Sequence, residues 1–292
     1  MEYLLLTAAT LCASGKALFC KVVGNARGRE VHLANCKSFA VAALIAAVFA
    51  LAEQGNAFRI SPFTLILSVI FACSVFFSQL NQVKAMAEGP ATLTTLIYAS
   101  SFLIPIVFGA IALGEPISPV QYIGVVMMFI SLFLMVWQRD TARICWRWLL
   151  FAMLAFLGSG TNAVLQKIHQ ASGHREELTG FLFYALAISS GLSLLMYWLS
   201  PEKKEAAQPV EKKSCLQKIA PLPLGICVGF LNFLNLMLAG RLPSVIQFPV
   251  YNIGSLILTG VISVIAFRER LSGQKLAGFC LGVLAILLIG MF

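Results

Sequence analysis

A small number of polar side chains stand inside long apolar runs of this sequence, and they are the residues that could do chemistry. Lys16 is the charged residue that lies deepest inside such a run. An ammonium group in apolar surroundings can bind a substrate carboxylate or phosphate. The same side chain could instead extend toward the end of its run or satisfy neighbouring carbonyls, so both interpretations stay open.

Two pairs of amide side chains stand out next. Gln79 and Gln82, and likewise Asn232 and Asn235, are three residues apart, which places both members of a pair on one face of a helix. Amides both donate and accept hydrogen bonds, so they suit a zwitterionic or polyhydroxylated ligand. The alternative is that they hydrogen-bond one helix to another.

Two tyrosines and two further asparagines complete the set. Tyr98, and Tyr251 with Asn252 beside it, would add an aromatic and polar wall, although tyrosines in apolar runs often serve in packing. Asn162 lies one residue from the position that corresponds to Lys16 in the second half of the chain. The predicted substrate-binding residues are Lys16, Gln79, Gln82, Tyr98, Asn162, Asn232, Asn235, Tyr251 and Asn252.

The composition indicates whether these residues are surrounded by water or by lipid. Of the 292 residues, 59% are hydrophobic and 11% charged, whereas a soluble domain carries about 25% charged residues. We therefore expect an all-α protein that crosses a lipid bilayer many times. The net charge of +9 is spread over short gaps between apolar runs, so no nucleic-acid partner is expected. The eight cysteines are scattered and are interpreted as small hydrophobic residues.

Ten runs approach the length of about 20 residues that a membrane-spanning helix needs. None shows the alternation of a barrel strand. The predicted spans are 3–23, 35–53, 61–83, 91–113, 118–138, 144–167, 178–199, 218–239, 244–267 and 272–292.

The sequence repeats itself with an offset that drifts from 145 to 154 residues. Gln79 and Gln82 align with Asn232 and Asn235, and the other matches are Ser14 with Ser159, Pro90 with Pro243, Tyr98 with Tyr251, Glu115 with Glu269, and Gly124 with Gly278. Each copy contains five predicted spans. Because five is odd, the two copies must lie in the membrane with opposite orientation.

These features resemble the EamA-type branch of the drug/metabolite transporter superfamily. The resemblance rests on two five-helix repeats, each with a Pro-led fourth helix, an acidic turn (Gly114-Glu115-Pro116; Arg268-Glu269-Arg270) and a Gly-bearing fifth helix. It implies ten transmembrane helices as two inverted repeats around a central cavity, working by alternating access. The predicted repeats are residues 1–140 and 141–292, with a polar loop at 200–217.

Several function classes are not expected. The sequence lacks GxSxG, HExxH and Walker-type motifs, so we predict no catalytic residue and no cofactor. His169 and His174 have no partner cluster, and no metal site is predicted. Small multidrug-resistance relatives carry a deep glutamate in their first helix. Lys16 occupies that helix here, which argues against export of cationic drugs.

The sequence thus predicts a carrier for a small polar metabolite, amino acid-like or otherwise anionic or zwitterionic, and export follows by analogy with the family. Loops after odd-numbered spans hold sixteen of the 21 Lys and Arg residues, which places both termini outside the cytoplasmic membrane. The alternatives are a proton-coupled multidrug or organic-cation exporter and a non-transporting membrane protein. The chain could be a monomer or a homodimer.

Overall fold

The computed structural model describes residues 2–24, 29–52, 58–88, 94, 97–136, 145–200, 218–267 and 273–291, and these residues contain helices and no strand. The elements are α1 (Glu2–Gly24), α2 (Arg29–Ala52), α3 (Pro62–Glu88), η1 (Ser100–Phe102), α5 (Leu103–Ala112), α6 (Pro119–Val136), α7 (Trp146–Ala171), η2 (Arg175–Glu177), α8 (Leu178–Leu199), α10 (Pro221–Ala239), α11 (Ser244–Phe267) and α12 (Gly273–Met291).

Six of these helices are long and apolar enough to cross a membrane: α1, α2, α3, α7, α8 with η2 before it, and α10. Shorter apolar helices cover Ile97–Ala112, Pro119–Ser131, Ser244–Leu258 and Leu276–Ile289. A helix satisfies its own backbone hydrogen bonds, which is what a segment surrounded by lipid requires. The described residues therefore form a bundle suited to the inside of a bilayer.

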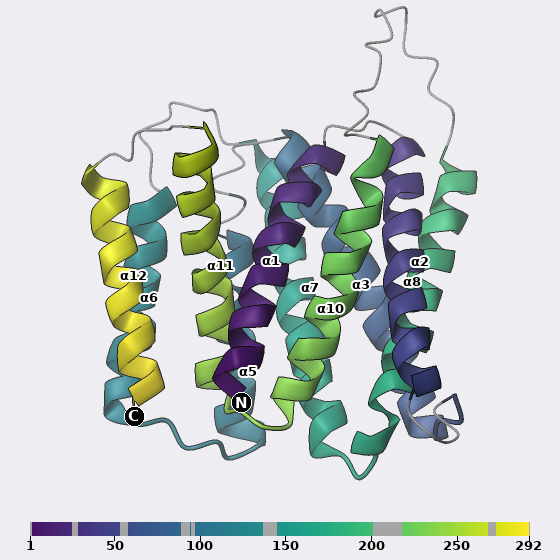
Figure 1. Ribbon diagram of the computed structural model, residues 1–292, viewed down its shortest axis with the longest axis horizontal. Helices are drawn as coiled ribbons and strands as arrows, with labels where there is room; N and C mark the ends of the chain where they lie inside the picture. The colour runs from purple at the N-terminus through teal and green to yellow at the C-terminus, as the bar shows by residue number, and fades with distance from the viewer. Residues whose placement is uncertain are drawn as a thin grey trace, which may run out of the picture.

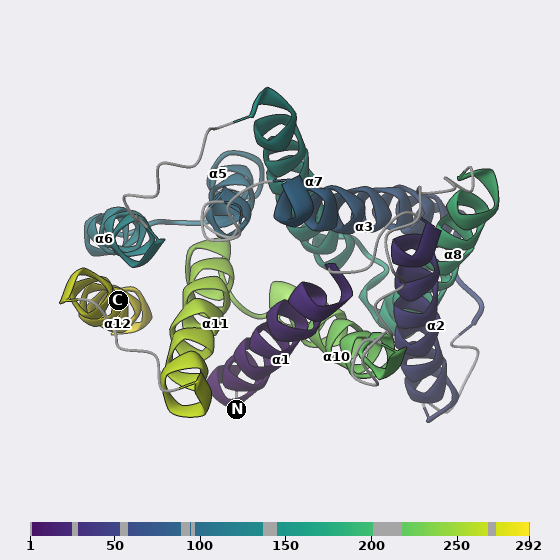
Figure 2. The ribbon, with the colours of Figure 1, turned by 90° about the horizontal axis from the view of Figure 1, so that it is seen from above.

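The helices run alternately up and down, and the two chain termini lie on the same face, at the bottom of Figure 1. We call this the termini face. Seen from above, α2 with α8 form one end of the molecule and α6 with α12 the other (Figure 2). Between them stand α1, α3, α7, α10 and α11, and α1 packs against both α10 and α11.

Close helix packing depends on small residues. Gly225 of α10 lies against Ser38 of α2, where an added Cβ would collide, and Gly229 lies against Ala42, where an added Cβ would be tight. On α12, Gly282 packs in the same way against Ser131 of α6. Glycines spaced four apart let two backbones approach. Here they join helices within one chain.

Helix ends differ from the predicted spans. The sixth span was predicted to end at residue 167, but α7 continues to Ala171; α2 begins at Arg29, six residues before the predicted start. In the fourth span, 91–113, the described helix covers residues 97–112 and includes the 3-10 turn η1. Apolar runs mark the part of a helix inside lipid, whereas the backbone stays helical through polar residues at its ends.

Candidate functional site

Lys16 and Tyr98, two of the predicted substrate-binding residues, contact each other. The Lys16 Nζ donates a hydrogen bond to the Tyr98 hydroxyl at 3.3 Å and lies 5.6 Å from the centre of its ring. Tyr98 stands one turn before η1, and α1 is held by α10 and α11. In the described part of the chain, the polar partner of this ammonium is thus a phenol rather than a carboxylate.

A second tyrosine extends this cluster. The Tyr251 hydroxyl on α11 lies beside the side chains of Asn235 on α10 and Asn252, and it is near enough to Tyr98 to interact with it electrostatically. Tyr98 also hydrogen-bonds with Ser159 on α7. The polar cluster therefore draws side chains from α1, α7, α10, α11 and the segment before η1.

Gln166 is a contact that the predicted set omitted. Its Nε2 donates to the Asn232 Oδ1 at 3.3 Å, while the Asn232 Nδ2 donates to the Val228 carbonyl one turn earlier. Gln166 is buried. Gln166 follows Asn162 by four residues and therefore lies on the same helix face, which is the sequence feature that could have indicated it.

The glutamine pair of α3 has a different partner helix from the asparagine pair of α10. Gln79 donates from Nε2 to the Oδ1 of Asn35 on α2, at 3.1 Å. At 1.5 Å per residue, Gln79 stands about 25 Å from the termini face and Asn232 about 10 Å. Equivalent amides of the two repeats thus lie at different depths, as expected of copies that have opposite orientations in the membrane.

Several amides of this interior keep a buried polar atom that no side chain or backbone group of the described residues satisfies. These atoms are the Oε1 of Gln82 and Gln247, the Oδ1 of Asn162 and Asn235, and the Nδ2 of Asn35. Buried polar atoms are usually hydrogen-bonded. An amide oxygen without a partner can accept a hydrogen bond from a donor group of a ligand.

Two grooves open elsewhere on the molecule. One, of about 490 Å³, is lined by apolar residues of α3 such as Ile70 and Phe77; the other, of about 430 Å³, lies between α5 and α7 beside Thr161. Neither is lined by a predicted substrate-binding residue. The polar cluster is distinct from both.

One acidic turn and one of the two histidines take part in ion pairs. Glu115 forms an ion pair with Lys167 at 2.7 Å, while Glu269 lies outside the described residues. His174 pairs with Glu177 at 3.4 Å. Among the residues that the structure describes, no three His, Cys, Asp or Glu side chains gather closely enough to hold a metal ion.

Comparison with known proteins identifies the family. The model of the EamA-like transporter family matches residues 1–137 and again residues 146–291. A solved structure described only as "Crystal structure of protein" shares the fold with a TM-score of 0.79 at 17% identity, covering 99% of this chain and 96% of its own. No curated protein matches the sequence. The chain therefore belongs to the EamA-like transporter family, whose members are multi-pass membrane transporters rather than enzymes.

Proposed function

We propose that this protein is an alternating-access carrier that exports a small anionic or zwitterionic metabolite, amino acid-like in its charge. In this proposal ten helices span the cytoplasmic membrane as two inverted five-helix repeats. The matches of one family model to both halves of the chain, and the apolar helices in each half, support this arrangement.

The observation that carries the proposed substrate class is the environment of Lys16. Its ammonium group donates a hydrogen bond to the Tyr98 hydroxyl, 3.3 Å away. No carboxylate of the described residues pairs with this partly exposed lysine, so its charge stays available for a ligand, and a carboxylate or phosphate is the group that would neutralise it. A cationic ligand at the same place would be repelled.

The amide oxygens suit a ligand that also carries donors. Asn235 and Asn162 each retain a buried Oδ1 without a partner. An ammonium or hydroxyl group of a substrate would satisfy them and remove the cost of leaving them unpaired. This favours a zwitterion or a polyhydroxylated anion over a simple anion.

The direction of the chain in the membrane follows from charge. The predicted loops after odd-numbered spans, with their flanks, hold sixteen of the 21 Lys and Arg residues, so the positive-inside rule assigns the side of these loops to the cytoplasm. Both termini then lie outside. A reporter fused to the C-terminus tests this directly, because a cytoplasmic signal would reverse the assignment.

A thermal-shift panel on the purified protein tests the substrate class. The panel contains amino acids, organic acids, phosphorylated sugars, nucleosides and organic cations. A ligand at about 100 times its Kd stabilises the folded state by about 2.7 kcal/mol, which is measurable. We expect an anion or zwitterion to raise the Tm of the wild type and of Lys37→Ala, an exposed lysine, but not of Lys16→Ala.

Stabilisation of wild type and Lys16→Ala alike by organic cations would overturn the proposed substrate class in favour of cation export. Stabilisation of both proteins by the same anion would remove Lys16 from the binding site.

A further inference from the structure

The turn after α5 directs an acidic side chain toward the other half of the chain. The Leu113 and Glu115 amides both donate to the Gly109 carbonyl, and Gly114 takes a positive φ of 63°. This is the usual glycine-containing end of a helix. It places the Glu115 carboxylate directly over Gly109, where any Cβ would collide with it.

The Glu115 carboxylate then contacts two elements of the second half. Its Oε1 accepts from the Nζ of Lys167 on α7 at 2.7 Å, and its Oε2 accepts from the Ser244 amide at 2.6 Å. Ser244 is the first residue of α11, so the carboxylate also lies at the positive end of that helix. The Lys167 Nζ completes the cluster by donating to the Leu242 carbonyl at 2.6 Å.

These contacts form a desolvated ion pair. The Lys167 side chain is 3% exposed and the Glu115 side chain 18%. Taking one partner away from the other would leave a charge with little water to stabilise it. The first half of the chain is therefore firmly attached to the second on the termini face.

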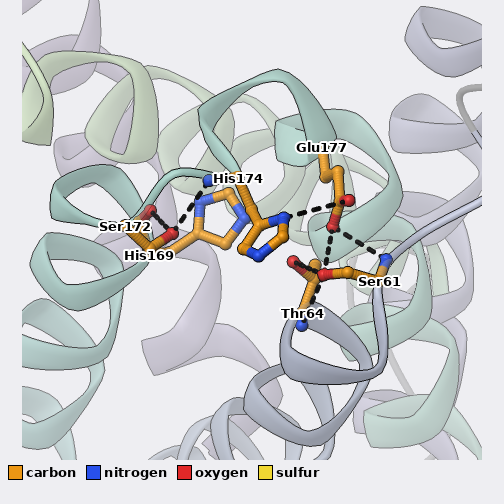
Figure 3. A network of polar contacts seen from close by, with 6 residues as sticks. All are labelled: Ser61, Thr64, His169, Ser172, His174 and Glu177. Atoms are coloured by element: carbon orange, nitrogen blue, oxygen red, sulfur yellow. Dashed lines mark hydrogen bonds and ion pairs between the residues drawn. The ribbon is translucent and has the colours of Figure 1, made fainter.

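A second carboxylate makes the reciprocal contact on the same face. Glu177 precedes α8 in the second half, and its Oε2 accepts from the Ser61 amide at 3.0 Å and the Ser61 hydroxyl at 2.9 Å (Figure 3). Ser61 precedes α3 in the first half. His174 closes the network from the other side of Glu177 (Figure 3).

The opposite face is held differently within the described residues. There Arg147 pairs with Glu88 at 3.7 Å, and their side chains are 74% and 36% exposed. Exposed pairs of this kind contribute little to stability. Among the described residues, the buried ion pair between the halves lies on the termini face, whereas the opposite face has this exposed pair and the contact of Arg29 with the Tyr197 carbonyl and ring.

We propose that Glu115 and Lys167 are the gate residues that close the termini face of this carrier, with Ser244 as the third member of the gate. Opening that face requires the α5 turn to separate from α7 and from the start of α11. This inference rests on the proposed function, since a gate has meaning only in a carrier.

Accessibility from one side of the membrane tests the gate. Asn162→Cys, placed in a chain whose other cysteines are replaced, lies about 8 Å deeper along α7 than Lys167, at 1.5 Å per residue. In oriented proteoliposomes, a membrane-impermeant maleimide should label it slowly from the termini face. Glu115→Gln should raise that rate at least tenfold without raising labelling from the opposite face.

Glu115→Gln/Lys167→Met serves as a second variant because it leaves no unpaired buried charge if the single variant folds poorly. We expect the same one-sided increase. Glu88→Gln, which removes the exposed pair, is the matched control and should change nothing. An unchanged rate in folded variants, or an equal increase from both faces, would overturn the gate.

Labelling requires no substrate, so the two proposals can fail separately. If Lys16→Ala keeps full substrate affinity while the one-sided increase occurs, the substrate class fails and the gate stands. If substrate binding depends on Lys16 but labelling does not depend on Glu115, the gate fails alone.

Discussion

Lys16 on α1 and Lys167 on α7 have different polar partners. Lys167 contacts a carboxylate at 2.7 Å and a backbone carbonyl at 2.6 Å and is almost completely buried. Lys16 contacts a phenol at 3.3 Å and is partly exposed. A neutralised lysine is suited to holding two elements together, whereas a lysine without an acid keeps its charge for a ligand.

The largest effect is expected when Lys167 alone is removed. Lys167→Met leaves the Glu115 carboxylate without its cation, which should cost about 3–5 kcal/mol of stability. Lys16→Met strands no acid and should change stability by less than about 1 kcal/mol. Thermal melting of both variants in one detergent checks the pair. Equal losses of stability in the two variants would show that Lys16 and Lys167 do not differ in this way.

Removing both charges of the pair should restore much of what the single variant loses. In Glu115→Gln/Lys167→Met no buried charge remains, so we expect its Tm to lie closer to the wild type than to Lys167→Met. Thermal melting of the double variant beside the single variant and the wild type measures this recovery of Tm. A double variant that melts with or below the single variant would show that packing around Lys167, rather than its charge, dominates.

The apolar runs predicted the six long apolar helices of the described residues, because the length of an apolar segment is a local property, while the total of ten spans stays a prediction. The internal repeat likewise predicted that Gln79 and Asn232 occupy equivalent positions. Their partners, Asn35 and Gln166, depend on how helices distant in sequence pack, which no spacing encodes. Lys167 was missed for the same reason: it stands at the end of an apolar run, where a solvated lysine is ordinary, and only the α5 turn buries it.

A smaller effect is expected at the reciprocal contact of the termini face. Ser61→Ala removes a hydroxyl that caps α3 through the Thr64 amide and donates to Glu177. Loss of a helix cap costs about 0.5–2 kcal/mol. The melting temperature should therefore fall less than in Lys167→Met. A larger fall would make Glu177, rather than Glu115, the main connection on this face.

Tyr98→Phe tests the hydrogen bond between the Lys16 ammonium and the Tyr98 hydroxyl. The change removes the hydroxyl that holds the Lys16 ammonium, while Tyr251→Phe removes a hydroxyl that contacts amides instead. A hydrogen bond made by a charged group is worth about 1.5–3 kcal/mol, so we expect substrate affinity to change about tenfold or more in Tyr98→Phe with little change in Tm. A collapse of stability would assign Tyr98 to packing.

The central claim is that the Lys16 ammonium binds the negative group of the substrate, and transport kinetics in proteoliposomes test it most directly. With the ligand identified by the thermal-shift panel, KM is measured for wild type, Lys16→Arg, Lys16→Ala and the exposed control Lys37→Ala. We predict that Lys16→Ala raises KM at least tenfold, that Lys16→Arg retains part of the affinity, and that Lys37→Ala matches the wild type. An unchanged KM in Lys16→Ala would contradict the account.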